Sequence, residues 1–129
     1  MTIYEKNAEI AKMLGWDFVR SSDVKIGGWA IPIKKKEQWI LKIKDKMYSK
    51  VHINLSFHSD ANWQFEALEY IHKQGHKTYD SYYPHTQKYQ YIIDDLDGIS
   101  CLIQSVFNSH KEAIFETLYL FSQYLKEKK

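Results

Sequence analysis

The chain has 129 residues, of which 16% are aromatic, and a formal net charge of +2. This length suits one domain with its own apolar core, and the aromatic content argues against disorder. A single cysteine excludes an internal disulfide framework and fits a reducing compartment. Because we find neither a leader peptide nor an apolar run of about 20 residues, we expect a cytoplasmic protein that does not cross a membrane.

Three amphipathic helices are predicted from apolar residues at helical spacing. Each begins at residues that can cap the free backbone N–H groups of the first turn, and the first two end at a glycine. An amphipathic helix needs an apolar surface to cover, and we expect a sheet to supply it. The signals are Thr2 with Glu5 and then Gly15 for the first helix, Ser59 or Asp60 and then Gly75 for the second, and Ser109 with Glu112 for the third.

Alternation of apolar and polar residues predicts the strands. The clearest strand spans residues 50–57 and forms a hairpin with residues 39–44, whereas a strand at 28–33 is weaker because Pro32 favours an edge position. Further strands are predicted after the second helix, at residues 77–83, 88–94 and 99–104. The pattern predicts a single α+β domain, residues 1–129, with an antiparallel sheet and three helices packed on it.

This order of elements resembles that of small phage and prophage proteins with the phage ABA sandwich domain. Residues 10–16 are similar to the family's N-terminal helix with its Leu-Gly-Trp-like end, and residues 57–71 to its Ser- and Trp-rich entry into an apolar helix. Residues 113–124 are similar to its C-terminal helix. The resemblance implies a phage origin and the family's fold, and it brings no catalytic residues. The tyrosine and lysine segments of this chain depart from the family pattern, so a ligand inferred for relatives need not be a ligand of this chain.

Lysines are concentrated in residues 25–50, which hold eight of them against two acids, while Arg20 is the sole arginine. Bidentate recognition of guanine or phosphate in DNA usually needs arginine, so sequence-specific DNA binding is disfavoured. A lysine-rich face can attract an anion, but lysines also protect the edge of a sheet in solvent. We favour the second interpretation.

Six histidines raise the question of a metal site. His72 and His76 have the spacing of zinc ligands on a helix, and His58 and Asp60 could add ligands. However, Gly75 breaks the helix between the two histidines, and no glutamate follows the first one as in metalloproteases. We therefore expect solvated histidines at a helix end, with no metal and no cofactor.

No catalytic residues are predicted. Asp94, Asp95 and Asp97 lack the spacing of a calcium loop and, with Gly98, favour a hairpin turn. Cys101 lies on a strand, where it should point inward or into an interface, and no histidine can be assigned to activate it. The sequence motifs of hydrolases, kinases and P-loop proteins are absent.

A tyrosine-rich segment is the candidate ligand-binding region. Tyrosine rings can stack on bases while lysines hold phosphates. The alternative, which we favour on propensity alone, is that these tyrosines pack under a helix or in a dimer interface. The candidate ligand-binding residues are Tyr79, Tyr82, Tyr83, His85, Lys88 and Tyr89.

The functional hypothesis is a small non-enzymatic phage accessory protein that acts by binding, as an anti-defence protein that sequesters an anionic nucleotide signal. The alternative is an interaction or structural module that binds a host or phage protein or a second copy of itself. A small enzyme is the third hypothesis.

The central helix gives a testable prediction about the core. Trp63 opens an apolar stripe that Ala67, Tyr70 and Ile71 continue, so we expect it to be buried against the sheet. Trp63→Ala should then cost about 3–5 kcal/mol, whereas Lys35→Ala should leave stability nearly unchanged. If Trp63 were instead a ligand platform, its alanine variant would keep its stability and lose binding.

Overall fold

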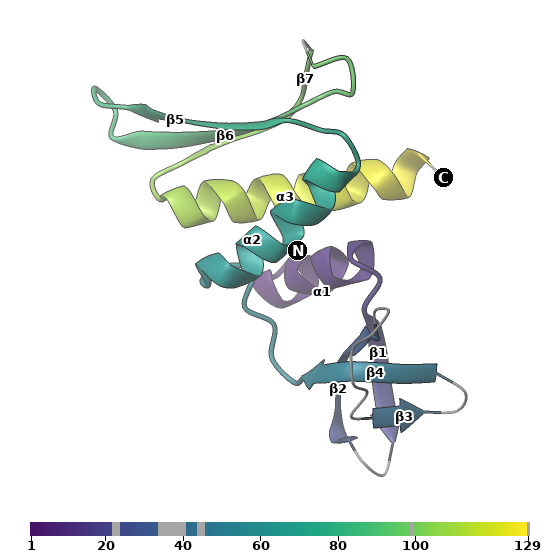
Figure 1. Ribbon diagram of the computed structural model, residues 1–129. Coiled ribbons are helices and arrows are strands. Elements are labelled where there is room, and N and C mark those ends of the chain that lie inside the picture. Colours follow the sequence, from purple (N-terminus) through teal and green to yellow (C-terminus); the bar gives the residue numbers. More distant parts are fainter. Residues whose placement is uncertain (22–23, 34–40, 44–45, 99, 129) are drawn as a thin grey trace. The chain divides into compact units, whose positions relative to one another are not determined.

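The computed structural model describes residues 1–21, 24–33, 41–43, 46–98 and 100–128. In these residues the chain forms three helices and seven strands, and the strands pair antiparallel (Figure 1). The predicted α+β class is therefore confirmed. The elements are α1 (Ile3–Met13), β1 (Asp17–Ser21), β2 (Val24–Pro32), β3 (Leu41–Ile43), β4 (Lys46–His52), α2 (Ala61–Lys73), β5 (Thr78–Tyr83), β6 (Lys88–Asp94), β7 (Cys101–Phe107) and α3 (His110–Lys128).

The strands form two sheets and not the single sheet that we predicted. Strands β1 to β4 form one sheet in the order β1-β2-β4-β3, and the other has the order β5-β6-β7. The chain divides into two compact units in the same way. Ala11–Leu55 contain the first sheet, and Met1–Ile10 with Ser56–Lys129 contain the second. The single domain over residues 1–129 stays a prediction.

The sheet of Ala11–Leu55 surrounds a small buried cluster of Val19, Ala30 and Tyr48. Strand β1, which the sequence analysis missed, supplies Val19. A hairpin between β3 and β4 is present, but β3 pairs with residues 46–48, before the start of the strand predicted at 50–57, and residues 50–52 pair with β2. The predicted hairpin residues 39–40 and 44–45, and the lysines at 34–36, lie outside the described residues.

Strand β4 ends at His52, five residues before the end that we predicted. Its neighbour β2 pairs with it only as far as Trp29, which lies opposite His52. Gly27, two residues before Trp29 on β2, has a φ of +79°. A residue in this conformation bends a strand away from its partner. Ile53, which the alternation placed on the apolar face, is consequently 53% exposed.

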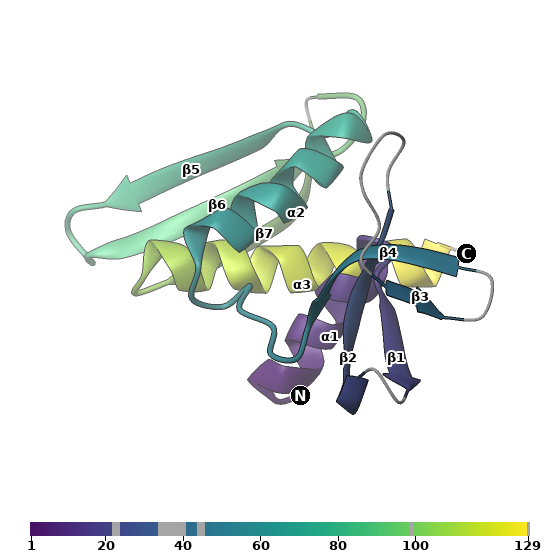
Figure 2. The ribbon, with the colours of Figure 1, turned by 60° about the horizontal axis from the view of Figure 1, so that its bottom comes forward.

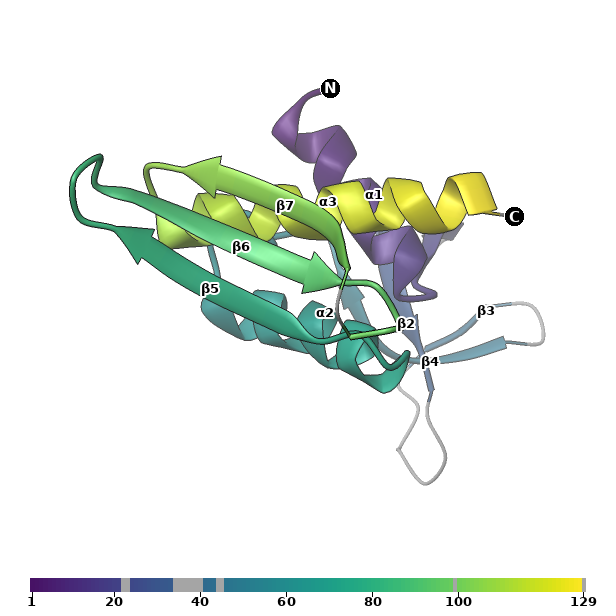
Figure 3. The ribbon, with the colours of Figure 1, turned by 90° about the horizontal axis from the view of Figure 1, so that it is seen from above.

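In the other unit, α3 lies along one face of the β5–β6–β7 sheet (Figures 1 and 3). Ile93 of β6 and the α3 residues Leu118 and Phe121 are fully buried in this layer. Helix α2 lies on the same side of the sheet as α3, next to β5 (Figures 2 and 3). The opposite face of the three strands carries exposed side chains, among them Tyr79 and Val106.

Helix α2 buries Ala67 and Ile71 as predicted, but its buried stripe is shifted away from Trp63 and Tyr70. Trp63 is half-buried, and its ring meets that of Phe57 edge-on at a centroid distance of 5.1 Å. Gln64 takes the inward position, where its Nε2 donates to the carbonyls of Phe57 (2.9 Å) and Lys111 (3.0 Å). The two hydrogen bonds satisfy the buried amide, so a polar residue can lie on the apolar stripe. The buried residues of α2 are Gln64, Ala67, Leu68 and Ile71.

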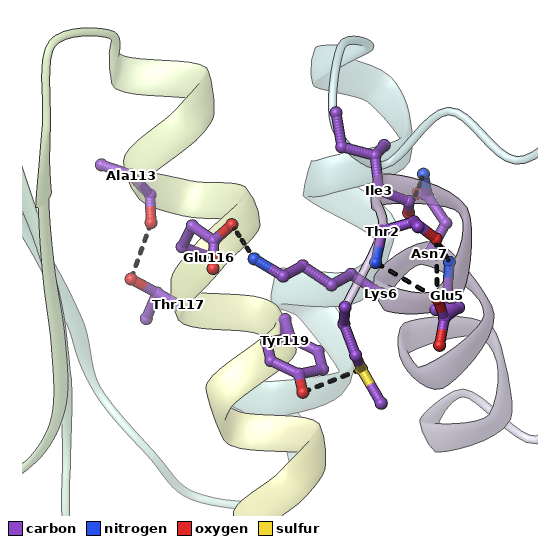
Figure 4. A network of polar contacts seen from close by, with 10 residues as sticks. Thr2, Ile3, Glu5, Lys6, Asn7, Ala113, Glu116, Thr117 and Tyr119 are labelled. Carbon is purple, nitrogen blue, oxygen red and sulfur yellow. Dashed lines mark hydrogen bonds and ion pairs between the residues drawn. The ribbon is translucent and has the colours of Figure 1, made fainter.

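All three predicted helix starts are confirmed by their capping bonds. In each case a side-chain oxygen accepts from a backbone N–H of the first turn. In α1 the carboxylate of Glu5 also accepts from the backbone N–H of Thr2 (Figure 4). The pairs are Thr2 with Glu5 (3.1 Å), Asp60 with Asn62 (2.9 Å) and Ser109 with Glu112 (3.5 Å).

The first turns of α1 are joined to the rest of their unit by polar contacts. Lys6 Nζ lies 2.5 Å from Glu116 Oε1 on α3 (Figure 4). The buried Asn7 accepts from the backbone N–H of Phe57 at 2.9 Å. These contacts hold α1 against α3 and against the segment that leads into α2.

Candidate functional site

A pocket with a volume of about 440 Å³ lies between α2, the start of α3 and strands β5 and β6. Small-molecule sites in proteins have volumes of roughly 300–1,000 Å³. Apolar side chains from α2 and α3 form one part of its wall, and polar groups from the sheet and from the start of α3 form the other. It is lined by Ala61, Gln64, Phe65, Leu68, Thr78, Asp80, Tyr91, His110, Lys111 and Ile114.

The register of the sheet brings the polar groups to this side. Thr78 pairs with the buried Ile93, and Asp80 pairs with Tyr91. Directly paired residues of antiparallel strands point to the same face, and Ile93 packs beneath the helices. Thr78, Asp80 and Tyr91 therefore all face the helices and the pocket.

An acid and a histidine meet across the mouth of the pocket. Asp80 Oδ2 lies 3.1 Å from His110 Nε2, and the two side chains are 62% and 45% exposed. A contact this exposed contributes only about 0–1 kcal/mol even when the histidine is protonated. A ligand can therefore replace either partner at small cost. Beside the pocket, the exposed His72 has its Nε2 2.8 Å from Thr78 Oγ1.

Aromatic rings are grouped around His110. Its ring centroid is 5.7 Å from that of Tyr89 and 6.4 Å from that of Tyr91. Tyr82 continues the group, with its centroid 4.7 Å from that of Tyr89. Phe65 on α2 is 66% exposed although it lines the pocket. Of these rings, those of Phe65, Tyr91 and His110 line the pocket and offer stacking surfaces for a planar ligand.

Burial and charge keep the Tyr91 phenol in its neutral form. Burial raises the pKa of Tyr91, and the negative charge of Asp80 raises it further, whereas a hydrogen bond with Thr78 acts in the opposite direction. Tyr91 is thus a neutral hydrogen-bonding group in the pocket wall. Lys111 brings a positive charge to the same wall.

The six residues predicted to bind a ligand do not form one surface. Tyr82 and Tyr89 pair across the β5–β6 hairpin on the side of the helices, next to His110. Alternation places three others on the opposite face, and one lies in the turn of the hairpin. Those on the opposite face are Tyr79, Tyr83 and Lys88, and the one in the turn is His85.

The two histidines with metal-ligand spacing have separate structural surroundings. His72 bonds to β5, while His76 is buried, contrary to our prediction that it is solvated. Its Nδ1 lies 2.8 Å from the carbonyl oxygen of Asp94, and its ring is 5.0 Å from that of Phe121. Gly75, with a φ of +98°, turns the chain back so that this ring enters the core. In the part of the chain that the structure describes, no three His, Cys, Asp or Glu side chains gather as a metal site.

The acidic turn between β6 and β7 is confirmed, but the inward position of Cys101 is wrong. Asp97 holds the turn by accepting from the backbone N–H (2.9 Å) and the hydroxyl (2.8 Å) of Ser100. The register of β6 against β7 then shifts between Ile93 and Asp94. Such a bulge changes which side chains point outward, and Cys101 is exposed.

Comparisons with models of known protein families, with curated proteins and with solved structures gave no match. The resemblance to phage ABA sandwich proteins therefore stays a prediction, and the pocket is interpreted from its own chemistry. Among the helices that the structure describes, none has both the length and the apolar character needed to span a membrane.

Sequence reasoning missed Asp80, Phe65, His110 and Lys111 as site residues. One signal was present locally, because the Ser109 cap places His110 and Lys111 in the first turn of a helix. Nothing local indicated that this turn would lie beside β5. That juxtaposition follows from the register of β5 on β6 and from the packing of α3 on the sheet.

Proposed function

We propose that the protein acts by binding a small ligand of the nucleotide class in the pocket between α2, α3 and β5, without changing it chemically. The observation that supports this most is the composition of the pocket lining. Within about 440 Å³ it combines the rings of Phe65, Tyr91 and His110 with an acid, Asp80, and a lysine, Lys111.

Each part of a nucleotide has a counterpart in this pocket. Stacking against Phe65, Tyr91 or His110 suits a flat base, since any base has a π face. Lys111 can pair with a phosphate. Asp80 and the neutral Tyr91 phenol offer hydrogen bonds for the polar edge of the base or the sugar hydroxyls. A single lysine in the lining favours a ligand with few phosphates over a triphosphate.

The arrangement of the pocket hydroxyls supports binding over catalysis. A nucleophilic hydroxyl is activated by a base within hydrogen-bond reach, and that base is oriented by a third group. Here His110 pairs with Asp80, whereas Thr78 is engaged by His72 at 2.8 Å. The acid–histidine pair and the threonine hydroxyl thus belong to separate interactions.

The biological setting that we propose follows from the resemblance to phage ABA sandwich proteins. A phage-encoded protein in the host cytoplasm that holds a nucleotide signal would keep that signal from a host defence system. Sequestration requires affinity and abundance, and it requires no turnover.

Isothermal titration of the full chain with nucleoside mono- and diphosphates and cyclic nucleotides tests this proposal. We expect micromolar or tighter binding of at least one of them. Phe65→Ala should weaken that binding about fivefold or more, because loss of a stacked ring costs about 1–3 kcal/mol. Tyr4→Ala is the matched control, since both rings lie on helices and are 66% exposed. Absence of binding across the panel would overturn the proposal.

A second candidate function is self-association or protein binding through the sheet face opposite the helices. Tyr79, Tyr83 and Val106 are 48%, 44% and 46% exposed on this face. Tyrosine is enriched in interfaces, and a stable one buries on the order of 1,000 Å² or more. Light scattering coupled to size exclusion distinguishes the outcomes. A monomer that does not change on Val106→Lys would contradict self-association.

A further inference from the structure

We infer that the pocket selects a guanine base and that the Asp80 carboxylate reads the edge of that base. This inference rests on the proposed function and names its ligand. The observation that carries it is an exposed carboxylate, Asp80, in the same lining as the rings of Phe65 and Tyr91, in a pocket of nucleotide size.

A carboxylate distinguishes the bases because it can only accept hydrogen bonds. The Watson–Crick edge of guanine offers two adjacent donors, N1–H and the 2-amino group, which match the two oxygens of a carboxylate. The same edge of adenine and of cytosine offers one amino donor next to an acceptor nitrogen, which repels the carboxylate. Uracil offers one donor between two carbonyl oxygens. Guanine alone can bind in a bidentate manner without an acceptor facing an acceptor.

Asp80 is able to make both bonds. Each carboxylate oxygen has two lone pairs, and the 3.1 Å contact with His110 Nε2 involves Oδ2. The Asp80 side chain is 62% exposed, so an incoming base can reach it without displacing the core.

The surrounding groups fit a guanine nucleotide in this orientation. The rings of Phe65 and Tyr91 belong to the same lining as Asp80, so a base at Asp80 lies within reach of stacking partners. Lys111 follows His110 at the start of α3 and provides the charge for a single phosphate. The carboxylate thus selects the base, and the lysine adds affinity that is independent of the base.

Titration of the full chain with GMP, IMP and AMP tests the inference. IMP is the sharpest ligand control, because it differs from GMP only by the missing 2-amino group. We expect GMP to bind about tenfold to a hundredfold more tightly than AMP, with IMP between them, since a hydrogen bond to a charged group contributes within this range. Asp80→Asn should remove the preference, because its amide group presents a donor to the donors of guanine.

Glu66→Gln is the matched control variant. Glu66 is an exposed acid on α2 next to Phe65, and it does not line the pocket, so its removal changes the net charge equally. It should keep the preference for GMP. Both variants concern exposed side chains, and their melting temperatures should equal that of the parent protein.

The outcomes separate the inference from the proposed function. Equal binding of GMP and AMP, or a preference for GMP that survives in Asp80→Asn, would overturn the role of Asp80 and leave nucleotide binding standing. Binding of simple organic amines such as choline in preference to nucleotides would show that the carboxylate and rings recognise a cation, and would overturn the guanine assignment. No binding of any nucleotide would overturn the proposed function itself.

Discussion

The buried side chain of Asn7 is predicted to be one of the largest single polar contributions to stability. It is 2% exposed and uses both ends of its amide. Its Oδ1 accepts from the backbone N–H of Phe57 at 2.9 Å, and its Nδ2 lies 3.1 Å from the carbonyl of Ile3 and 2.9 Å from Nδ1 of His58. Asn7→Ala removes all three bonds at once.

The cost of this change can be built from its parts. The backbone N–H of Phe57 would lose its partner in a buried position, which costs about 1–3 kcal/mol. The bonds to Ile3 and His58 lie in partly buried surroundings and contribute about 1 kcal/mol each. The sum is about 3–5 kcal/mol, a large share of the roughly 5–15 kcal/mol that stabilises a domain.

Urea unfolding of the variants measures this cost. Asn7→Asp should not restore the lost stability, because the acceptor that it keeps for Phe57 belongs to a buried carboxylate whose second oxygen faces the carbonyl oxygen of Ile3. Asn62→Ala is the control, since Asn62 is exposed on α2 and uses its backbone N–H, which alanine retains. A loss below about 1 kcal/mol for Asn7→Ala would refute this account of how α1 is joined to its unit.

Two further predictions concern the core and one charge pair. Phe57→Ala should cost about 3–5 kcal/mol because the ring is fully buried, whereas Trp63→Ala should cost less, and thermal melts of the two variants rank them. The Lys46 ammonium, 2.7 Å from the carboxylate of Asp17, lowers the pKa of Asp17. A lowered pKa in the folded state adds stability above the ordinary range of aspartate and loses it as pH falls through the lower value. Asp17→Asn should therefore weaken the loss of stability in acid, as measured by urea unfolding at several pH values, and an unchanged acid dependence would count against the pair.

The helices could be predicted well from the sequence because their signals are local. Thr2 with Glu5, Asp60 and Ser109 each form the capping bond that their position indicates. A capping box involves residues three apart, and the chain can satisfy it before any tertiary contact forms. The face that α2 buries was less predictable, since Gln64 is stabilised in the core by two hydrogen bonds that its Nε2 donates to carbonyls distant in the chain.

The division into two sheets could not be predicted because strand pairing is not local. Alternation at residues 50–57 indicated a strand, but where β4 ends depends on the bend of its neighbour at Gly27. The candidate site has the same origin. Asp80 and His110 are 30 positions apart in the chain, and only the packing of α3 on the sheet brings them to 3.1 Å.

The binding of a nucleotide in this pocket is tested most directly by an NMR titration of the ¹⁵N-labelled chain with GMP. The account predicts saturable changes in the amide chemical shifts of the segments that line the pocket. These segments are residues 61–68 of α2, 78–80 of β5 and 110–114 of α3. They should be weaker with AMP and lose their dependence on the base in Asp80→Asn. A spectrum that does not change at millimolar GMP, or changes confined to the sheet face of Tyr79 and Val106, would contradict it.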